Sequence, residues 1–224
     1  MSAHSLAELI EALPEGLRQQ ALTHSSWTEA GESYERLAYL GDSVLALAIA
    51  SGIHERFPEL DAGGLTKVHN YAVSGTACDA VGRELGIPAM LEGADPGGED
   101  AIPAEILLAG SRPVPEVTES LIGACFLAFG FERAAAAVGD AFERQIEQGR
   151  EAPVDAKSAL QELLARRRAR VSYAVIAESG PAHERTFEVE ATVESERVGT
   201  GSGRSKKAAE QMAAEEALQS LGKS

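Results

Sequence analysis

The chain has 224 residues, a formal net charge of −15 and 44% hydrophobic residues, which indicates an acidic globular protein with one large domain or two small ones. Its longest nearly uninterrupted apolar run, 121–131, is shorter than the roughly 20 residues of a membrane-spanning helix, so we expect no membrane contact. Two cysteines, Cys78 and Cys125, exclude a disulfide framework, and the first residues show no signal peptide, which together predict a cytoplasmic location.

The acidity is distributed unevenly along the chain. Residues 1–150 contain 9 Lys and Arg against 23 Asp and Glu, a net charge of −14, whereas residues 151–224 contain 11 against 12, a net charge of −1. A polar stretch with a glycine and a proline separates the two halves, which is typical of a linker. We therefore predict two domains, over 1–147 and 156–222, joined by a linker over 148–155.

The first domain is predicted to be all-α. Apolar residues at spacings of three and four predict an amphipathic helix over 35–55. Turn-forming residues predict an exposed loop over 92–99. A helix that is apolar nearly all round is expected over 119–131, and a third helix over 134–146 closes the domain.

The second domain is predicted to follow the order α-β-β-β-α. A helix over 156–168 precedes strands over 171–177, 186–194 and 197–201, and Ser205 is expected to cap the last helix. The middle strand alternates apolar and polar residues strictly, which predicts that one of its faces is buried. The last helix carries one apolar stripe, made of Ala209, Met212, Ala213, Ala217 and Leu221. We expect both helices to pack on one face of the sheet.

Four acidic residues of the first domain are candidate site residues. Glu35 and Asp42 are two helical turns apart and lie on one face, and Glu116 and Glu119 stand at the head of the most apolar helix. Acids beside an apolar helix are costly to bury unless they are paired or bound to a cation. Alternatively, Glu35, Glu116 and Glu119 are ordinary first-turn acids that stabilise the helix dipole.

Two glycines near these acids predict how the helices meet. Gly41 and Gly123 would allow two helices to approach closely. Without a metal ion, Asp42, Glu116 and Glu119 should repel one another across that contact. At least one of the three carboxyls should therefore have a raised pKa.

Basic residues of the second domain gather at two places. A glycine-rich approach and Arg204, Lys206 and Lys207 surround the start of the last helix, where lysines oppose the helix dipole. This arrangement indicates an anion gripped by cations and free backbone N–H groups, the alternative being a solvated, slightly unfavourable helix start. The run Arg166-Arg167-Arg168 and Arg170 are interpreted as a solvated helix end that attracts RNA only at long range.

Residues 156–221 resemble the double-stranded RNA-binding domain. The resemblance rests on Gln161-Glu162, on Gly180-Pro181-Ala182-His183 and on Ser205-Lys206-Lys207-Ala208-Ala209-Glu210-Gln211. It implies that Gln161 and Glu162 face ribose hydroxyls, that His183 enters a second minor groove and that Lys206 and Lys207 bind phosphate. A histidine in a turn is otherwise usually just exposed.

Residues 1–150 resemble the ribonuclease III family. The run Glu35-Arg-Leu-Ala-Tyr-Leu-Gly-Asp42-Ser-Val-Leu45 resembles the family signature, and Ala21-Leu-Thr-His-Ser25 and Thr118-Glu-Ser-Leu-Ile-Gly123 resemble two further motifs. The resemblance implies a homodimeric, Mg²⁺-dependent endonuclease of double-stranded RNA, with Mn²⁺ as a substitute metal. It would process ribosomal and other structured RNA precursors and leave 5′-phosphate and 3′-hydroxyl ends.

The resemblance also assigns roles to residues. Phosphodiester hydrolysis by a divalent metal needs clustered carboxylates, and no histidine or cysteine cluster offers another mechanism. Asp42 and Glu119 are expected to bind the metal directly, with Glu116 as the third ligand and Glu35 as a supporting catalytic acid. Tyr39 stands where the family has an aromatic residue that plugs the partner subunit, although it could also be plain core.

The sequence departs from the family pattern at three positions. Ala38 and Ala62 stand where the family has glutamates, and Glu116 stands where it has an aspartate. The four retained acids favour an enzyme whose metal site is weakened. The two alanines favour the alternative, a catalytically impaired dimeric protein that binds double-stranded RNA.

Overall fold

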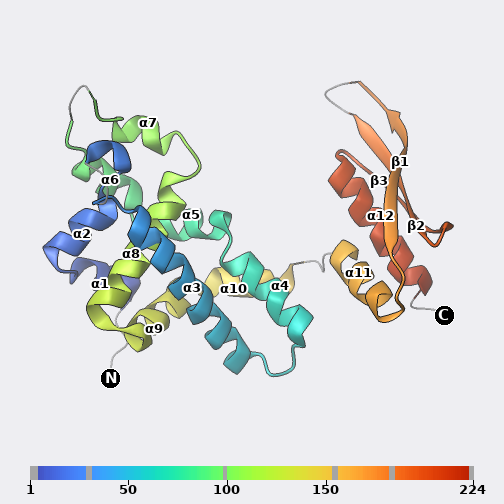
Figure 1. Ribbon diagram of the computed structural model, residues 1–224, viewed down its shortest axis with the longest axis horizontal. Coiled ribbons are helices and arrows are strands. Elements are labelled where there is room, and N and C mark those ends of the chain that lie inside the picture. Colours follow the sequence, from blue (N-terminus) through green and yellow to red (C-terminus); the bar gives the residue numbers. More distant parts are fainter. Residues whose placement is uncertain (1–4, 29–31, 98–99, 153–155, 182–184, 222–224) are drawn as a thin grey trace. The chain divides into compact units, whose positions relative to one another are not determined.

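The computed structural model describes residues 5–28, 32–97, 100–152, 156–181 and 185–221, without the side chains of Glu162 and Arg166. The chain forms two compact units, Met1–Ala152 and Pro153–Ser224, and each is described by itself (Figure 1). The predicted linker starts too early, because a helix runs through residue 151. Residues 148–151 read as linker because they are mostly polar, but Ile146 and Gly149 of the same helix are buried.

The first unit is helical in the part of the chain that the structure describes. Its elements are α1 (Leu6–Glu11), α2 (Glu15–Leu22), the 3-10 turn η1 (Ser25–Trp27), α3 (Glu35–Arg56), α4 (Ala62–Ala72), α5 (Gly75–Glu84), α6 (Ile87–Ala94), α7 (Ala104–Leu108), α8 (Pro113–Phe129), α9 (Phe131–Ala141) and α10 (Glu143–Glu151). This confirms the all-α prediction and, in α3, the long helix expected over 35–55.

Three predicted boundaries in this unit are wrong. Helix α8 begins at Pro113 rather than at residue 119, since proline is favoured in a first helical turn, where its missing N–H group is not needed. The helix expected over 134–146 is two helices, α9 and α10, which meet at the buried Phe142. The loop expected over 92–99 begins later, because α6 continues to Ala94; residues 98–99 lie outside the described part.

Helices α3 and α8 form the centre of this unit (Figure 1). Their backbones are in direct contact: a Cβ on Gly41 would overlap the carbonyl oxygen of Glu119, and a Cβ on Gly123 would overlap the carbonyl oxygen of Leu37. The close approach predicted from these two glycines is confirmed. Fully buried side chains pack around the crossing, among them Leu45, Ile49, Leu121 and Ile122.

Helix α3 is by length and composition able to cross a membrane, which the length of uninterrupted apolar runs did not indicate. The same test is passed by core helices of soluble proteins, and 44% of the most apolar window of α3 is buried inside the unit. Its buried side, which includes Leu45 and Ile49, packs against α8 and α9. The apolar character of α3 is therefore accounted for by the core that it helps to form.

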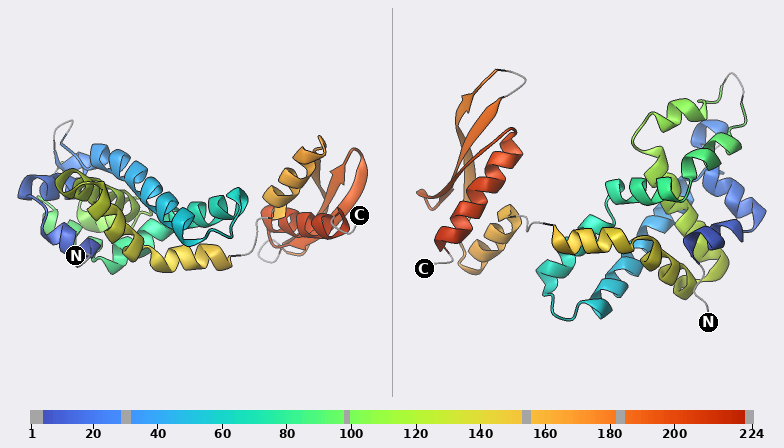
Figure 2. Two further views of the ribbon diagram at one scale, coloured as in Figure 1. Left: turned by 90° about the horizontal axis from the view of Figure 1, so that it is seen from below. Right: turned by 180° about the vertical axis from the view of Figure 1, so that it is seen from behind.

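The second unit has the predicted α-β-β-β-α order. It consists of α11 (Ala156–Arg166), β1 (Val171–Ser179), β2 (Thr186–Val193), β3 (Glu196–Gly203) and α12 (Lys206–Leu221). The strands form an antiparallel sheet in the order β1-β2-β3, with both helices on one side (Figure 2). Val189 and Ala191 are buried, as the alternation in β2 predicted.

The glycines of β3 allow the strand to lie directly on α12. A Cβ on Gly199, Gly201 or Gly203 would overlap the backbone of that helix. The glycine-rich approach therefore serves helix–sheet packing, and the anion site at the start of α12 stays a prediction. Met212 is 49% exposed and does not belong to the buried stripe of α12. That stripe consists of Ala209, Ala213, Ala214 and Ala217.

Candidate functional site

The four predicted acids of the first unit lie around the crossing of α3 and α8. Glu35 is the first residue of α3 and Asp42 follows two turns later; both side chains are exposed. Glu116 lies in the first turn of α8 and Glu119 one turn further, and both are half-buried. Because Gly41 contacts the backbone of Glu119, the fold joins two pairs of acids that are 74 or more residues apart in the sequence.

Tyr34 holds one of these acids in place. Its hydroxyl donates a hydrogen bond of 2.9 Å to Oε2 of Glu116. Burial, the hydrogen bond to Glu116 and the nearby charges of Glu116 and Glu35 raise the pKa of Tyr34 well above its ordinary value, so the hydroxyl stays protonated and donates. Tyr34 was not among the site residues predicted from the sequence. The sequence feature that could have indicated Tyr34 is its position directly before Glu35, at the start of a helix, from which a long side chain can reach a neighbouring element.

Glu119 is the most perturbed carboxyl of the group. Burial, followed by the charges of Asp42 and Glu116, raises its pKa to about 7. A raised pKa is the consequence expected from acids that repel one another across a close helix contact. The neighbouring Cys78 is fully buried, and burial together with Glu119 and Asp42 raises its pKa to about 12, so the thiol stays neutral there.

The chemistry of these side chains fits a hard divalent cation. Mg²⁺ prefers oxygen ligands, and the four side chains offer only carboxylate oxygens. The ion pairs found among the described residues of this unit use other acids, so no basic side chain neutralises this group there. No three His, Cys, Asp or Glu side chains in the described ranges converge as a ready-made metal site. The acids must therefore rotate to bind one ion together.

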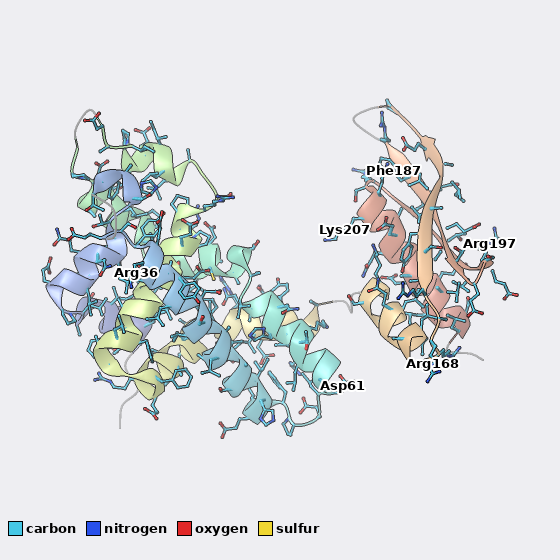
Figure 3. All side chains as sticks on the ribbon, in the orientation of Figure 1. Arg36, Asp61, Arg168, Phe187, Arg197 and Lys207 are labelled. Atoms are coloured by element: carbon cyan, nitrogen blue, oxygen red, sulfur yellow. The ribbon has the colours of Figure 1, made fainter. Side chains whose placement is uncertain are left out.

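The two alanines that replace family glutamates lie in different surroundings. Ala38 is 7% exposed and lies on α3 one turn after Glu35 and one turn before Asp42. Ala62 starts α4, beyond the opposite end of α3, where Figure 3 labels its neighbour Asp61. Asp61 caps α4 by accepting a hydrogen bond of 2.8 Å from the N–H group of Gly64. Of the two alanines, Ala38 is the one that lies on the helix carrying Glu35 and Asp42.

Tyr39 is 81% exposed on α3, so the alternative of plain core is wrong. Among the described residues of this helix, the other large exposed apolar side chain is Leu47, which is 55% exposed. An aromatic ring that one chain leaves in water is a candidate for burial by a partner. Its role as a plug stays a prediction.

The predicted RNA-binding lysines lie at the start of α12. Both are exposed, and Figure 3 shows Lys207 pointing away from the sheet. The hydroxyl of Ser205 accepts a hydrogen bond of 3.1 Å from the N–H group of Ala208, which confirms the predicted cap. Nζ of Lys206 lies 3.9 Å from Glu178 and 5.7 Å from the centre of the Phe187 ring.

The remaining predicted RNA contacts are only partly visible. Gln161 is exposed on α11. Glu162 belongs to the same helix, but its side chain lies outside the described part of the structure, as does His183 altogether. The RNA-binding roles of these residues stay predictions.

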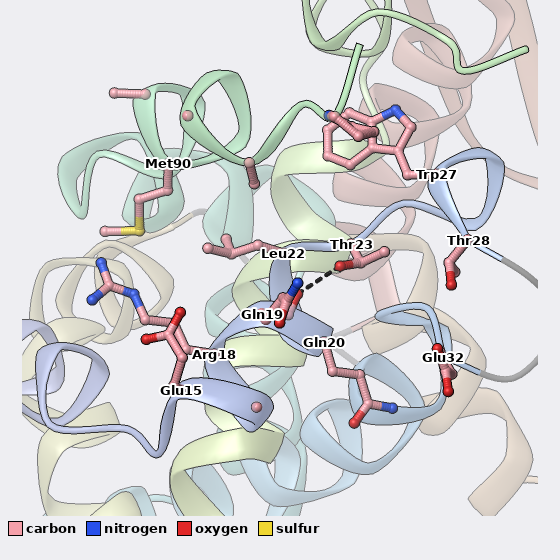
Figure 4. A pocket seen from close by; sticks show the side chains of 15 residues that line it. Glu15, Arg18, Gln19, Gln20, Leu22, Thr23, Trp27, Thr28, Glu32 and Met90 are labelled. Atoms are coloured by element: carbon pink, nitrogen blue, oxygen red, sulfur yellow. Dashed lines mark hydrogen bonds between the residues drawn. The ribbon is translucent and has the colours of Figure 1, made fainter. Parts of the chain in front are cut away.

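A pocket of the first unit lies away from the acids. It has a volume of about 880 Å³ and lies between α2 and α6, with Trp27 at one end (Figure 4). Its wall carries Glu15, Arg18 and Met90, and none of the four predicted acids lines it. The indole N–H group of Trp27 donates a hydrogen bond of 2.7 Å to the carbonyl oxygen of Ile102, so this residue is tied to the loop before α7.

Known proteins share both units. Residues 14–145 match the family model described as Ribonuclease-III-like, and residues 156–221 match the double-stranded RNA binding motif. The chain is 36% identical over 222 residues to Ribonuclease 3 of Pelotomaculum thermopropionicum, covering 91% of this chain and 86% of that protein. It is 38% identical over 229 residues to Ribonuclease 3 of Streptomyces coelicolor, covering 98% and 80%.

A solved nuclease domain of ribonuclease III from Campylobacter jejuni is also similar, with a TM-score of 0.49, 24% identity and coverage of 67% of this chain and 100% of that one. The family models and the two relatives together extend over nearly the whole sequence. The chain therefore belongs to the ribonuclease III family and joins a ribonuclease-III-like domain to a double-stranded RNA binding motif.

Proposed function

We propose that this protein cleaves double-stranded RNA by metal-assisted phosphodiester hydrolysis and leaves 5′-phosphate and 3′-hydroxyl ends. The observation that carries the proposal is the half-buried Glu119 beside Asp42 and Glu116, with no basic partner among the described residues. A bound Mg²⁺ or Mn²⁺ ion would neutralise charge on the phosphoryl oxygens and make a water nucleophilic. Carboxylates that repel one another without a cation are suited to hold one.

The acids have different roles in this proposal. Asp42 and Glu119 would bind the metal directly, since Asp42 follows the glycine that contacts the backbone of Glu119, and its charge acts on the Glu119 carboxyl. Glu116 is the third ligand, and Tyr34 orients it by donating to one of its two carboxylate oxygens. The other oxygen of Glu116 stays available. Glu35 adds negative charge next to Tyr34 and supports the site without binding directly.

The second unit holds the substrate. Lys206 and Lys207 bind backbone phosphates, Gln161 and Glu162 face ribose hydroxyls in one minor groove, and His183 enters the next. Such contacts read the shape of an A-form duplex rather than its sequence. This is consistent with ribosomal and other structured RNA precursors as substrates.

We also propose that two copies associate through the nuclease domain in the cytoplasm. Tyr39 supports this, because a tyrosine at 81% exposure leaves a large aromatic surface in water on the helix that carries Glu35 and Asp42. A dimer that covers Tyr39 would place two acidic groups on one assembly.

A second candidate function is a dimeric protein that binds double-stranded RNA without cutting it. Ala38 favours it, since a buried alanine stands between Glu35 and Asp42 on α3 where the family supplies a carboxylate.

The deciding experiment combines cleavage with metal binding. Purified protein is incubated with long duplex RNA and Mg²⁺ or Mn²⁺, the products are sized, and the melting temperature is recorded with and without metal for the parent and for Asp42→Asn. We expect short duplex products from the parent only, and a metal-induced rise of its melting temperature that Asp42→Asn loses. RNA binding without cleavage in either metal would establish the second candidate. An equal metal-induced shift in both proteins would place the metal elsewhere.

A further inference from the structure

A cavity in the second unit lies at the end of α11, where the chain turns toward β1. It has a volume of about 490 Å³, and Figure 3 shows Arg168 at this end of the unit. Three of its lining residues are polar: Gln161, Arg168 and Arg170. Its remaining lining residues are Leu164, Ala165, Ala169 and Val171. Two arginines thus share one concave surface with the glutamine that the proposed function places against ribose hydroxyls.

The backbone at Arg168 is unusual. Its φ angle is +56°, in the left-handed region that side chains with a Cβ disfavour. The N–H group of Ala169 bonds to the carbonyl of Leu164, and that of Arg168 to the carbonyl of Ala165, both at 3.0 Å. This pair of hydrogen bonds ends a helix and favours glycine at the position of Arg168. The chain therefore presents a guanidinium group at a position where glycine is the more stable choice.

The two arginines also lack acidic partners in the part of the chain that the structure describes. The ion pairs found among the described residues of the second unit are Lys157–Glu210, Arg185–Glu178, Arg197–Glu190 and Lys206–Glu178. Neither Arg168 nor Arg170 takes part in them, although residues 151–224 contain 12 Asp and Glu. A helix C-terminus stabilises nearby cations, which accounts for an exposed arginine. The helix C-terminus does not explain why two arginines line one cavity together with Gln161.

We propose that Arg168 and Arg170 form a phosphate-binding notch that extends the duplex RNA surface beyond the lysines of α12. The planar guanidinium group donates two parallel hydrogen bonds to phosphate oxygens, which suits a backbone phosphate next to the ribose at Gln161. This inference rests on the proposed RNA binding by the second unit. It goes beyond long-range attraction, because it assigns direct contacts to two particular arginines.

Glycine at position 168 separates the ligand-binding role from a structural one. Arg168→Gly removes the guanidinium group and relieves the left-handed backbone, so the melting temperature should be unchanged or higher. Duplex RNA affinity, measured on the full chain in EDTA to prevent cleavage, should fall about threefold to tenfold, and the slope of its salt dependence should decrease by about one counterion. Arg170→Ala should weaken binding to a similar extent.

Arg167→Ala is the matched control, since Arg167 is exposed and does not line the cavity. It should change affinity by less than the other two variants. Equal losses of RNA affinity in all three variants would show that only net charge matters, and would overturn the proposal of a phosphate-binding notch. Unchanged RNA affinity in Arg168→Gly with a changed hydrodynamic radius would assign the arginines to the acidic unit, and would overturn it too.

A fourth variant distinguishes this failure from failure of the proposed function. Lys206→Ala/Lys207→Ala tests RNA binding at α12 in the same assay. If the parent does not bind duplex RNA, the proposed function itself fails. If the parent binds and the lysine variant weakens binding while Arg168→Gly does not, only the notch is refuted.

Discussion

Gly41→Ala is the most informative single perturbation of the nuclease unit. The added Cβ would overlap the carbonyl oxygen of Glu119, and it would lie 2.6 Å from the carbonyl carbon of the same residue and 2.9 Å from the backbone nitrogen of Gly123. All three atoms belong to the backbone of α8, so no side-chain rotation relieves the contact. Helices α3 and α8 must therefore move apart at the crossing that carries Asp42 and Glu119.

The size of the effect follows from two opposing contributions. Overpacking a core costs about 1–3 kcal/mol, and backbone-on-backbone overlap belongs at the upper end of that range. Alanine in place of glycine inside a helix returns about 1 kcal/mol. The net loss of unfolding free energy should be about 2 kcal/mol, which lowers the melting temperature of a unit of this size by roughly 4–8 °C.

Gly52→Ala is the matched control on the same helix. No heavy atom lies within 4 Å of the Cβ that Gly52 would gain, so this variant should become more stable by up to about 1 kcal/mol. Both variants are measured by thermal and urea unfolding. A loss of stability in Gly41→Ala together with a gain in Gly52→Ala would support a helix crossing whose distance is set by backbone contact. Stability changes of the same sign in both variants would refute this reasoning.

The same variant tests how the site depends on the crossing. Separation of α3 from α8 moves Asp42 away from Glu119, so cleavage by Gly41→Ala should fall further than its folded fraction explains. The assay is single-turnover cleavage of duplex RNA well below the melting temperature. Parent-like cleavage by a folded Gly41→Ala variant would show that the spacing of these two acids does not limit the reaction.

The remaining predictions concern the acids at the crossing and the lysines of α12. In EDTA, the pKa of Glu119, raised from 4.5 to about 7, adds stability that is present below pH 4.5 and lost as the pH rises through about 7. With solvent screening the loss should be about 1–2 kcal/mol, and Glu119→Gln should abolish it; a parent-like pH profile in that variant would contradict the prediction. Ala38→Glu should raise the rate of cleavage at low Mg²⁺ by about tenfold to a hundredfold and narrow the advantage of Mn²⁺ over Mg²⁺. If the variant folds normally and needs as much Mg²⁺ as the parent, position 38 is not a missing ligand. Lys206→Ala/Lys207→Ala should reduce the salt slope of RNA binding by about two counterions at an unchanged melting temperature, and an undiminished slope would remove these lysines from the RNA surface.

The sequence by itself determined the elements whose burial is periodic. Helix α3 and strand β2 were predicted nearly to their ends, because one face of each is buried along its whole length and leaves a regular pattern. Gly41 and Gly123 also revealed the helix crossing, since glycine weakens a helix interior and is favoured there where a second backbone comes close. The grouping of the acids followed from that crossing together with the family motifs.

Only the tertiary structure decided what depends on distant partners. Phe142 lies between α9 and α10 with a backbone outside the helical region (φ −97°, ψ 7°) and is completely buried, and nothing in the local pattern marks a break there. Tyr34 acquires its role from Glu116, which is 82 residues away. Gly199 and Gly201 belong to the glycine-rich approach that was predicted to serve an anion site, and their packing role follows only from the position of α12 directly on them. In each case local sequence reports the periodicity of one element, whereas the contact that fixes the residue's role comes from another.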